Sequence, residues 1–202
     1  MIDRRLRAAV DRPVSAVGVR LAGVGVGAEI LTLVGLVFGI GACVALADDR
    51  RWMALTLWLA NRLVDGIDGA VARVVGPTDR GGFIDIVSDF AVYGGFVVAV
   101  AYARPDARVA CVALLCAYYV SGAAFLAWSS MAEKRARIVG DNRSLHFVGG
   151  IAEGAETIVV YVLLCVWPSA TVEIVWTFTV AVAITALQRI WFAWQTLTPH
   201  DA

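Results

Sequence analysis

The chain has 202 residues, of which 60% are hydrophobic and 17% charged, and its mean hydropathy is +0.76. Soluble domains carry about 25% charged residues, so this composition excludes an ordinary soluble protein and indicates an integral membrane protein. Lys and Arg total 17, as do Asp and Glu. A net charge of zero gives no indication of a nucleic-acid partner.

The N-terminal segment, residues 1–22, differs from the rest of the chain because it is rich in arginine. It lacks the apolar core and the small-residue cleavage site of a signal peptide. We therefore expect it to be an amphipathic segment that lies on the membrane surface. Its basic residues are Arg4, Arg5, Arg7, Arg12 and Arg20.

Six apolar stretches follow, each long enough for the ~20 residues of a spanning helix. Continuous apolar runs predict helices rather than a β-barrel, whose strands alternate apolar and polar residues. We therefore predict an all-α integral membrane protein with a single domain over 1–202, in which a bundle of six transmembrane helices occupies 24–194. The expected spans are approximately Val24–Ala47, Trp52–Val75, Gly82–Ala103, Val109–Met131, Ser144–Trp167 and Ala170–Trp194, and the longest break between them is Ala132–Arg143.

The positive charges in the loops predict the orientation, since Lys-rich and Arg-rich loops tend to stay in the cytoplasm. With both termini inside, the cytoplasmic side would hold eleven of the Lys and Arg residues in termini and loops, and the other side four. We expect a multi-pass protein of the inner (plasma) membrane with both termini in the cytoplasm.

Four carboxylates lie within the second and third predicted spans. Asp65 and Asp68 are three residues apart, and Asp85 and Asp89 four apart, so each pair shares one face of its helix. Ionisable residues in spans cost ~2.5 to 3.5 kcal/mol each on insertion scales, which makes each a functional hypothesis. The short, Pro-containing connection 74–80 makes the two helices antiparallel neighbours. Grouped carboxylates favour Mg²⁺ or Mn²⁺ over zinc, and a two-metal site acting on a phosphate is the chemistry expected.

A buried charge network that merely locks two helices together is the structural alternative for these carboxylates. Such networks balance their signs, whereas here Arg73, with Arg62 as a second candidate, faces four carboxylates. For Asn61, hydrogen bonding between helices is at least as well supported as a role in substrate binding. In the sixth span, we expect Arg189 to reach the lipid headgroups.

The aspartate pattern resembles the signature of the CDP-alcohol phosphatidyltransferase family, D-x2-D-G-x2-A-R-x7or8-G-x3-D-x3-D. The six-helix count and the cytoplasmic placement of the motif agree with that family. The resemblance implies a membrane enzyme, often a homodimer, in which the hydroxyl of an alcohol displaces CMP from a CDP-linked lipid. Eight positions match over 25 residues, namely Asp65, Asp68, Gly69, Ala72, Arg73, Gly81, Asp85 and Asp89.

The resemblance also implies roles for the matching residues, with two divalent ions, Mg²⁺ or Mn²⁺, in the site. Asp65, Asp68 and Asp85 would hold one ion, and Asp65, Asp85 and Asp89 the second. Asp89 would also be the catalytic base that takes the proton from the attacking hydroxyl. The CDP moiety would contact Gly69, Arg73 and Thr78.

The first predicted span departs from the family pattern. Members commonly carry Pro-Asn three residues before a Thr, whereas here Ala28 and Glu29 precede Thr32. We include Thr32 and Glu29 among the candidate CDP contacts. The Glu29 carboxylate would either repel a diphosphate or bind the cytosine amino group or a metal.

The fifth predicted span carries a second polar group, in which Arg143, Glu153 and Glu156 are candidates for binding the acceptor alcohol. The alternative is that the two glutamates pair with an arginine only to satisfy burial. Family branches with phosphorylated acceptors are expected to place several cations around the acceptor phosphate. One arginine with two glutamates favours an uncharged polyol or an amino-alcohol, although the basic residues of the preceding loop can reverse this preference.

We therefore expect metal-dependent transfer of a phosphatidyl group from CDP-diacylglycerol to the hydroxyl of a small polar alcohol, in phospholipid synthesis. One alternative is phosphotransfer from a CDP-linked small alcohol to a lipid hydroxyl. A second is a membrane prenyltransferase, since Asn61, Asp65 and Asp68 loosely match a diphosphate-binding box. A third is a non-enzymatic divalent-cation carrier or scaffold, against which the one-sided placement of the carboxylates argues.

Overall fold

The computed structural model describes residues 2–139 and 154–197, and these residues form helices and short connections with no strand among them. This confirms the predicted all-α class. The chain divides into two compact units, Met1–Ala99 and Val100–Ala202.

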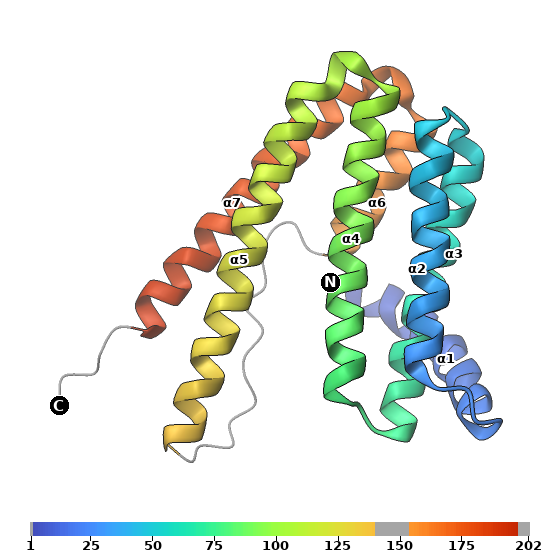
Figure 1. Ribbon diagram of the computed structural model, residues 1–202, viewed down its shortest axis with the longest axis vertical. Helices are drawn as coiled ribbons and strands as arrows, with labels where there is room; N and C mark the ends of the chain where they lie inside the picture. The colour runs from blue at the N-terminus through green and yellow to red at the C-terminus, as the bar shows by residue number, and fades with distance from the viewer. Residues whose placement is uncertain (1, 140–153, 198–202) are drawn as a thin grey trace. The chain divides into compact units, whose positions relative to one another are not determined.

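The first unit contains α1 (Ile2–Gly23), α2 (Ala28–Ala47), α3 (Arg51–Val75) and most of α4 (Asp79–Ala103). Helix α2 lies along α3, and α1 packs on α3 as well (Figure 1). Close approach of α1 depends on Gly18, because a Cβ at that position would lie 2.6 Å from the Ala70 Cβ. The carboxylate-bearing helix α3 therefore has helices packed on two of its sides.

Helix α4 packs against α2 and α3 through small and aromatic residues. A Cβ on Gly39 would lie 2.4 Å from Val92 Cγ2, so α2 and α4 are in direct contact there. The rings of Trp58 and Phe96, both fully buried, have centroids 5.5 Å apart. Rigid side chains in close contact fix the position of α4 against α3.

The connection between α3 and α4 follows the sequence prediction. Helix α3 ends before Gly76, whose φ of 96° lies in the left-handed region that favours glycine. Pro77 then prevents the helix from continuing, because proline has no backbone N–H to donate. Helix α4 begins at Asp79, so the two helices bring their carboxylates to the same end of the unit.

The second unit contains the end of α4, then η1 (Pro105–Ala107), α5 (Arg108–Val139), α6 (Gly154–Val166), η2 (Pro168–Ala170) and α7 (Thr171–Leu197). Helices α5 and α7 pack along one another, and α6 contacts α7. Arg189 of α7 donates to Ser121 Oγ of α5 at 2.9 Å and lies over the Phe125 ring, 5.2 Å from its centroid. The guanidinium is thus engaged between helices, rather than reaching headgroups as the sequence suggested.

The break expected at Ala132–Arg143 is wrong at its beginning, because α5 continues to Val139. Its added residues are mostly Ala, Glu, Lys and Arg, which are strong helix formers. Charge therefore ends the apolar run without ending the helix. The N-terminal segment is also helical, as α1, whereas its place on a membrane surface stays a prediction.

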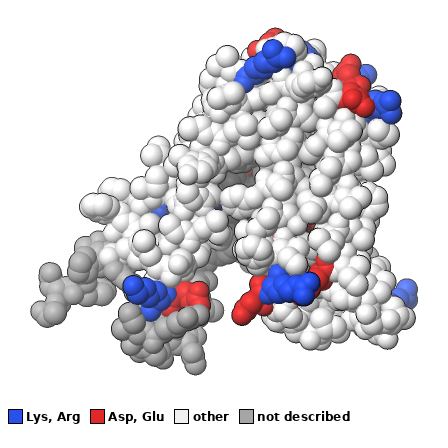
Figure 2. Space-filling model, in the orientation of Figure 1, with Lys and Arg blue, Asp and Glu red and all other residues white. Residues whose placement is uncertain are grey.

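Four segments of the described residues are long and apolar enough to cross a membrane: Ala28–Ala47, Asp79–Ala103, Pro105–Lys134 and Pro168–Leu197. On the face shown in Figure 2, charged side chains of the first unit gather toward the ends of its helices and leave the outer surface between them uncharged. Ile30, Val37 and Val44 of α2 are exposed apolar side chains. This pattern indicates a membrane-integral protein.

Two predicted spans do not meet the same criterion. Helix α3 has the length for a span but carries several charged residues, and the described part of α6 has 13 residues. The count of six spans therefore stays a prediction.

Candidate active site

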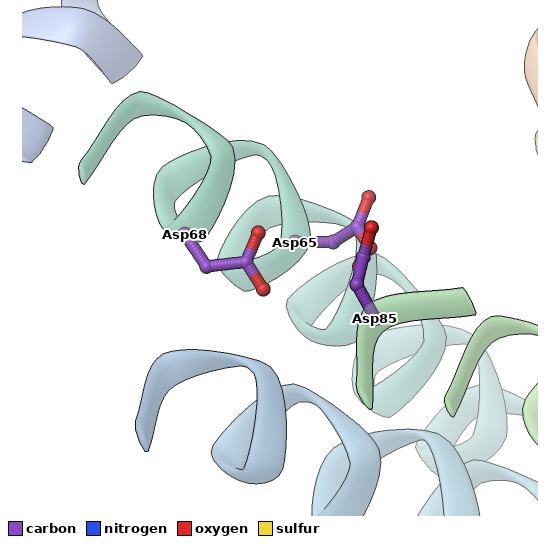
Figure 3. Close-up of side chains that lie close together, drawn as sticks. All are labelled: Asp65, Asp68 and Asp85. Atoms are coloured by element: carbon purple, nitrogen blue, oxygen red, sulfur yellow. The ribbon is translucent and has the colours of Figure 1, made fainter. Parts of the chain in front are cut away.

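Three of the four predicted metal-binding carboxylates converge in the first unit. Asp65 and Asp68 project from α3 and Asp85 from α4, and their side chains turn toward one another (Figure 3). One carboxylate oxygen from each lies within 4.8 Å of the others. Asp68 is only 6% exposed, while Asp65 and Asp85 are half-buried. Like charges this close disfavour full ionisation unless a cation compensates them, and three carboxylate oxygens fit a hard divalent ion such as Mg²⁺ or Mn²⁺.

Thr32 supports this cluster from α2. Its hydroxyl donates a hydrogen bond to Asp68 Oδ2 at 2.7 Å, and it is itself 7% exposed. The hydrogen bond limits rotation of the Asp68 carboxylate. Outer hydrogen bonds of this kind orient metal ligands.

Asp89, the fourth predicted ligand, is engaged differently. It lies one helical turn after Asp85 on α4, and its Oδ1 accepts a hydrogen bond from Arg62 Nη2 at 2.9 Å. Arg62 Nη1 is also 3.7 Å from Asp65 Oδ2. Arg62 is therefore the arginine that faces the carboxylates, rather than Arg73, which is exposed in the last turn of α3.

A cleft of about 480 Å³ opens beside the carboxylates, lined by α2, α3, α4 and the turn between α3 and α4. Its size is within the range of small-molecule sites. Arg73 is outside the lining, but its Nη1 lies 3.5 Å from where a Cβ on Gly69 would be. Six predicted site residues line the cleft: Glu29, Thr32, Asp68, Gly69, Thr78 and Asp85.

Glu29 joins α2 to the α3–α4 turn at the cleft. Its Oε1 accepts a hydrogen bond from the Thr78 hydroxyl at 3.2 Å, and its Oε2 lies 3.3 Å from Arg80 Nε. Thr78 Oγ1 in turn accepts from the Gly81 backbone N–H at 2.9 Å. The arrangement caps the start of α4 and places the Glu29 carboxylate beside two polar partners, which offsets the charge that the sequence departure introduces.

Asn61 forms the hydrogen bond between helices that the sequence favoured. Its Nδ2 donates to the Gly35 carbonyl of α2 at 2.8 Å, and the side chain is 3% exposed. Its Oδ1 accepts from Arg62 Nε at 2.8 Å. Asn61 therefore positions Arg62 rather than lining the cleft.

The residues around Arg62 are those that sequence reasoning missed. Arg62 lies over the rings of Trp58 and Tyr93, at 4.9 and 5.0 Å from their centroids. A signal was present, because Trp58 precedes Arg62 by four residues and Tyr93 follows Asp89 by four. Residues four apart share a helix face, so the sequence places Trp58 on the face of Arg62 and Tyr93 on the face of Asp89.

The predicted acceptor site cannot be assembled from the described residues in the same way. Arg143 and Glu153 lie outside the described residues. Glu156 is exposed in the first turn of α6, where it lines a groove with Val159 and Phe178 within the second unit.

Residues 26–193 match the family model for CDP-alcohol phosphatidyltransferase. The inner membrane protein YnjF of Escherichia coli (strain K12) is 37% identical over 182 residues, covering 86% of this chain and 85% of that protein. The phosphatidylinositol phosphate synthase of Mycobacterium marinum is 26% identical over 203 residues, covering 93% of this chain and 82% of that enzyme.

Two solved structures share the fold. The crystal structure of the Mycobacterium tuberculosis phosphatidylinositol phosphate synthase with CDP-DAG bound has a TM-score of 0.74 at 21% identity, covering 95% of this chain and 99% of that one. The same enzyme in complex with manganese and citrate has a TM-score of 0.73 at 23% identity, covering 94% and 93%. The likeness at this level of identity is one of fold.

Proposed function

Because the chain belongs to the CDP-alcohol phosphatidyltransferase family and is a phosphotransferase, we propose that it transfers a phosphatidyl group from CDP-diacylglycerol to a small polar alcohol and releases CMP. The observation that carries this proposal is the convergence of Asp65, Asp68 and Asp85 beside a cleft large enough for a nucleotide. Membership of an enzyme family favours this reaction over the cation carrier. It also favours it over the prenyltransferase.

In the proposed site, Asp65, Asp68 and Asp85 hold one divalent ion, and Asp65, Asp85 and Asp89 hold a second. The close grouping of the first three carboxylates supports this assignment, and the Thr32 hydrogen bond to Asp68 orients one of them. When bound, the ions would offset the negative charge on the diphosphate oxygens. Manganese in the Mycobacterium tuberculosis structure makes Mn²⁺ a natural ion to test beside Mg²⁺.

Asp89 is the proposed base for the acceptor hydroxyl. Arg62 engages its Oδ1, so Oδ2 is the oxygen that we assign to the proton. Bases positioned in this way contribute about 10²- to 10⁴-fold to a rate.

The cleft is the proposed nucleotide pocket. The absence of a side chain at Gly69 leaves room for close approach of the diphosphate, and Arg73 lies beside it to offset charge. Thr32, Thr78 and Glu29 line the same cleft. Glu29 would accept a hydrogen bond from the cytosine amino group, an interaction that suits a carboxylate already balanced by Arg80.

The proposal extends to the acceptor and the surroundings of the enzyme. Arg143, Glu153 and Glu156 stay the proposed acceptor residues, with an uncharged polyol or amino-alcohol as the first class. The name of the Mycobacterium marinum relative supports an alcohol phosphate as the second class. We further propose a single domain with six spans, α1 on the membrane surface, a site facing the cytoplasm, and a homodimer.

CMP release tests this function. The full chain, purified in lipid micelles, would be incubated with CDP-diacylglycerol and Mg²⁺ or Mn²⁺ and screened over inositol, inositol phosphate, glycerol phosphate and serine. We expect release that requires metal and one acceptor and that is lost in Asp89→Asn. A CDP-linked alcohol with diacylglycerol tests the reverse donor arrangement, and metal-independent release would contradict the proposal.

A further inference from the structure

Arg62 donates hydrogen bonds to three acceptors, one on α3 and two on α4. Its side chain is 9% exposed. Nε donates to Asn61 Oδ1 at 2.8 Å, Nη1 to the Tyr93 hydroxyl at 2.8 Å, and Nη2 to Asp89 Oδ1 at 2.9 Å. The guanidinium therefore uses all three of its nitrogens, and its planar fork has a fixed orientation.

The surroundings of Arg62 are themselves fixed. Trp58, fully buried, and Tyr93 place their rings within about 5 Å of the guanidinium carbon, an arrangement that stabilises a cation. Asn61 is held by its hydrogen bond to the Gly35 carbonyl of α2. The positive charge is consequently built into the first unit by parts of α2, α3 and α4.

This fixed charge divides the four carboxylates unequally. Asp65, Asp68 and Asp85 form the group whose oxygens lie within 4.8 Å of one another, and Arg62 reaches this group only at 3.7 Å, through Asp65. Asp89 is paired with Arg62 directly. A cation approaching Asp89 must share the carboxylate with a guanidinium, and like charges at short range in a partly buried site repel strongly.

We infer that Arg62 is a positioning residue that competes with a divalent cation for Asp89, so that the site takes up two ions with unequal affinity and the ion that needs Asp89 binds more weakly. The inference rests on the proposed function, which assigns two ions to the site. It adds that a side chain of the protein, that of Arg62, lowers the affinity of the site for the second ion. The affinity for the second ion would then depend on Arg62 as well as on the carboxylates that hold it.

Direct counting of bound Mn²⁺ tests the inference without any catalytic readout. The full chain in detergent micelles would be titrated with Mn²⁺, with free ion measured by electron paramagnetic resonance. Arg62→Met removes the charge and keeps an unbranched side chain, while Arg62→Lys keeps the charge. Arg51→Met is the matched control, because Arg51 lies on the same helix, is exposed, and also lies over an aromatic ring, that of Trp52 at 5.3 Å.

We expect two dissociation constants in the wild type that differ at least tenfold, with the weaker class lost in Asp89→Asn. Arg62→Met should tighten the weaker class at least tenfold, so that the two constants converge. Arg62→Lys and Arg51→Met should keep the separation of the wild type. Loss of packing alone would weaken binding, so tightening identifies competition.

Unchanged constants in Arg62→Met, or a single class of Mn²⁺ in the wild type, would overturn the inference. If Arg62→Met does not elute as a folded species in size-exclusion chromatography, Arg62→Gln replaces it, since Gln retains a donor without the charge. The weaker Mn²⁺ class should then tighten at least tenfold in Arg62→Gln. Absence of Mn²⁺ binding in every protein, the wild type included, would contradict the proposed function itself. Mn²⁺ binding that is unchanged in Arg62→Met contradicts this inference alone.

Discussion

The two units use polar side chains in different ways. In the first unit, side-chain hydrogen bonds join separate helices and lead to carboxylates, as from Thr32 to Asp68 and from Arg62 to Asp89. In the second unit, a hydrogen bond between helices leads from Arg189 to the Ser121 hydroxyl, and hydroxyls such as that of Thr179 donate to the carbonyl one turn earlier in the same helix, that of Val175 at 2.8 Å. The first pattern arranges charges for a ligand, whereas the bonds of the second join helices or satisfy donors through uncharged partners.

Because of this difference, substitutions of the same kind should have different effects on ligand binding in the two units. A polar side chain that connects helices to a carboxylate influences ligand binding, whereas one that bonds within its own helix influences stability alone. Pairs of matched substitutions, one in each unit, therefore test this difference.

The largest difference is expected between two aspartates. Asp89→Asn should lower metal-dependent CMP release by about 10²- to 10⁴-fold, because the amide cannot accept the proton. Asp106→Asn, in η1 of the second unit, changes an exposed aspartate paired with Arg104 and should leave release within about twofold. Equal losses in both variants would show that the carboxylates of the first unit have no special role.

Two buried threonines form the next pair. Thr32→Val removes the hydrogen bond to Asp68 and should weaken Mn²⁺ binding about 10- to 100-fold, which is typical for partners of metal ligands. Thr179→Val in α7 removes a hydroxyl of similar burial, 8% exposed against 7%. It should leave Mn²⁺ binding unchanged. A Thr32→Val protein with wild-type affinity would contradict the role assigned to that hydrogen bond.

Substitution of glycines tests the packing of the helices. Gly39→Ala forces a Cβ to within 2.4 Å of Val92 and should destabilise the fold by about 1 to 3 kcal/mol, as overpacking does. The melting temperature in detergent should fall, and adding Val92→Ala should restore most of it. Gly154→Ala in α6, where a Cβ meets nothing within 4 Å, should cause no such fall. Failure of Val92→Ala to compensate would argue against this contact.

The smallest difference concerns a single hydroxyl beside each of two arginines. Ser121→Ala removes one acceptor of Arg189, which keeps the Ser121 carbonyl at 3.2 Å, and Tyr93→Phe removes one acceptor of Arg62. Each should cost about 0.5 to 1.5 kcal/mol of stability. Only Tyr93→Phe should also change the Mn²⁺ titration, because Arg62 alone of the two is paired with Asp89. A change in both titrations would remove the distinction between the units.

The sequence predicted the fold class, the position of the α3–α4 turn and the convergence of three carboxylates, because periodicity and Pro77 determine those features locally. The sequence favoured Arg73 as the arginine that faces the carboxylates, whereas in the structure Arg62 faces them. Both arginines lie on the same helix as Asp65 and Asp68, but only the packing of α4 decides which arginine Asp89 meets. Contacts between helices depend on side-chain volumes such as those of Gly39 and Val92, which a single sequence does not reveal as a pair.

Helix α3 has a consequence for how the chain enters a membrane. It carries Arg62, Asp65 and Asp68, and its own composition does not place it among the four candidate spans. Its polar groups are matched by neighbours on both sides in the chain, Thr32 of α2, synthesised before it, and Asp89 of α4, synthesised after it. We expect α3 to be retained in lipid only when α2 and α4 accompany it, because ionisable side chains without partners are costly there.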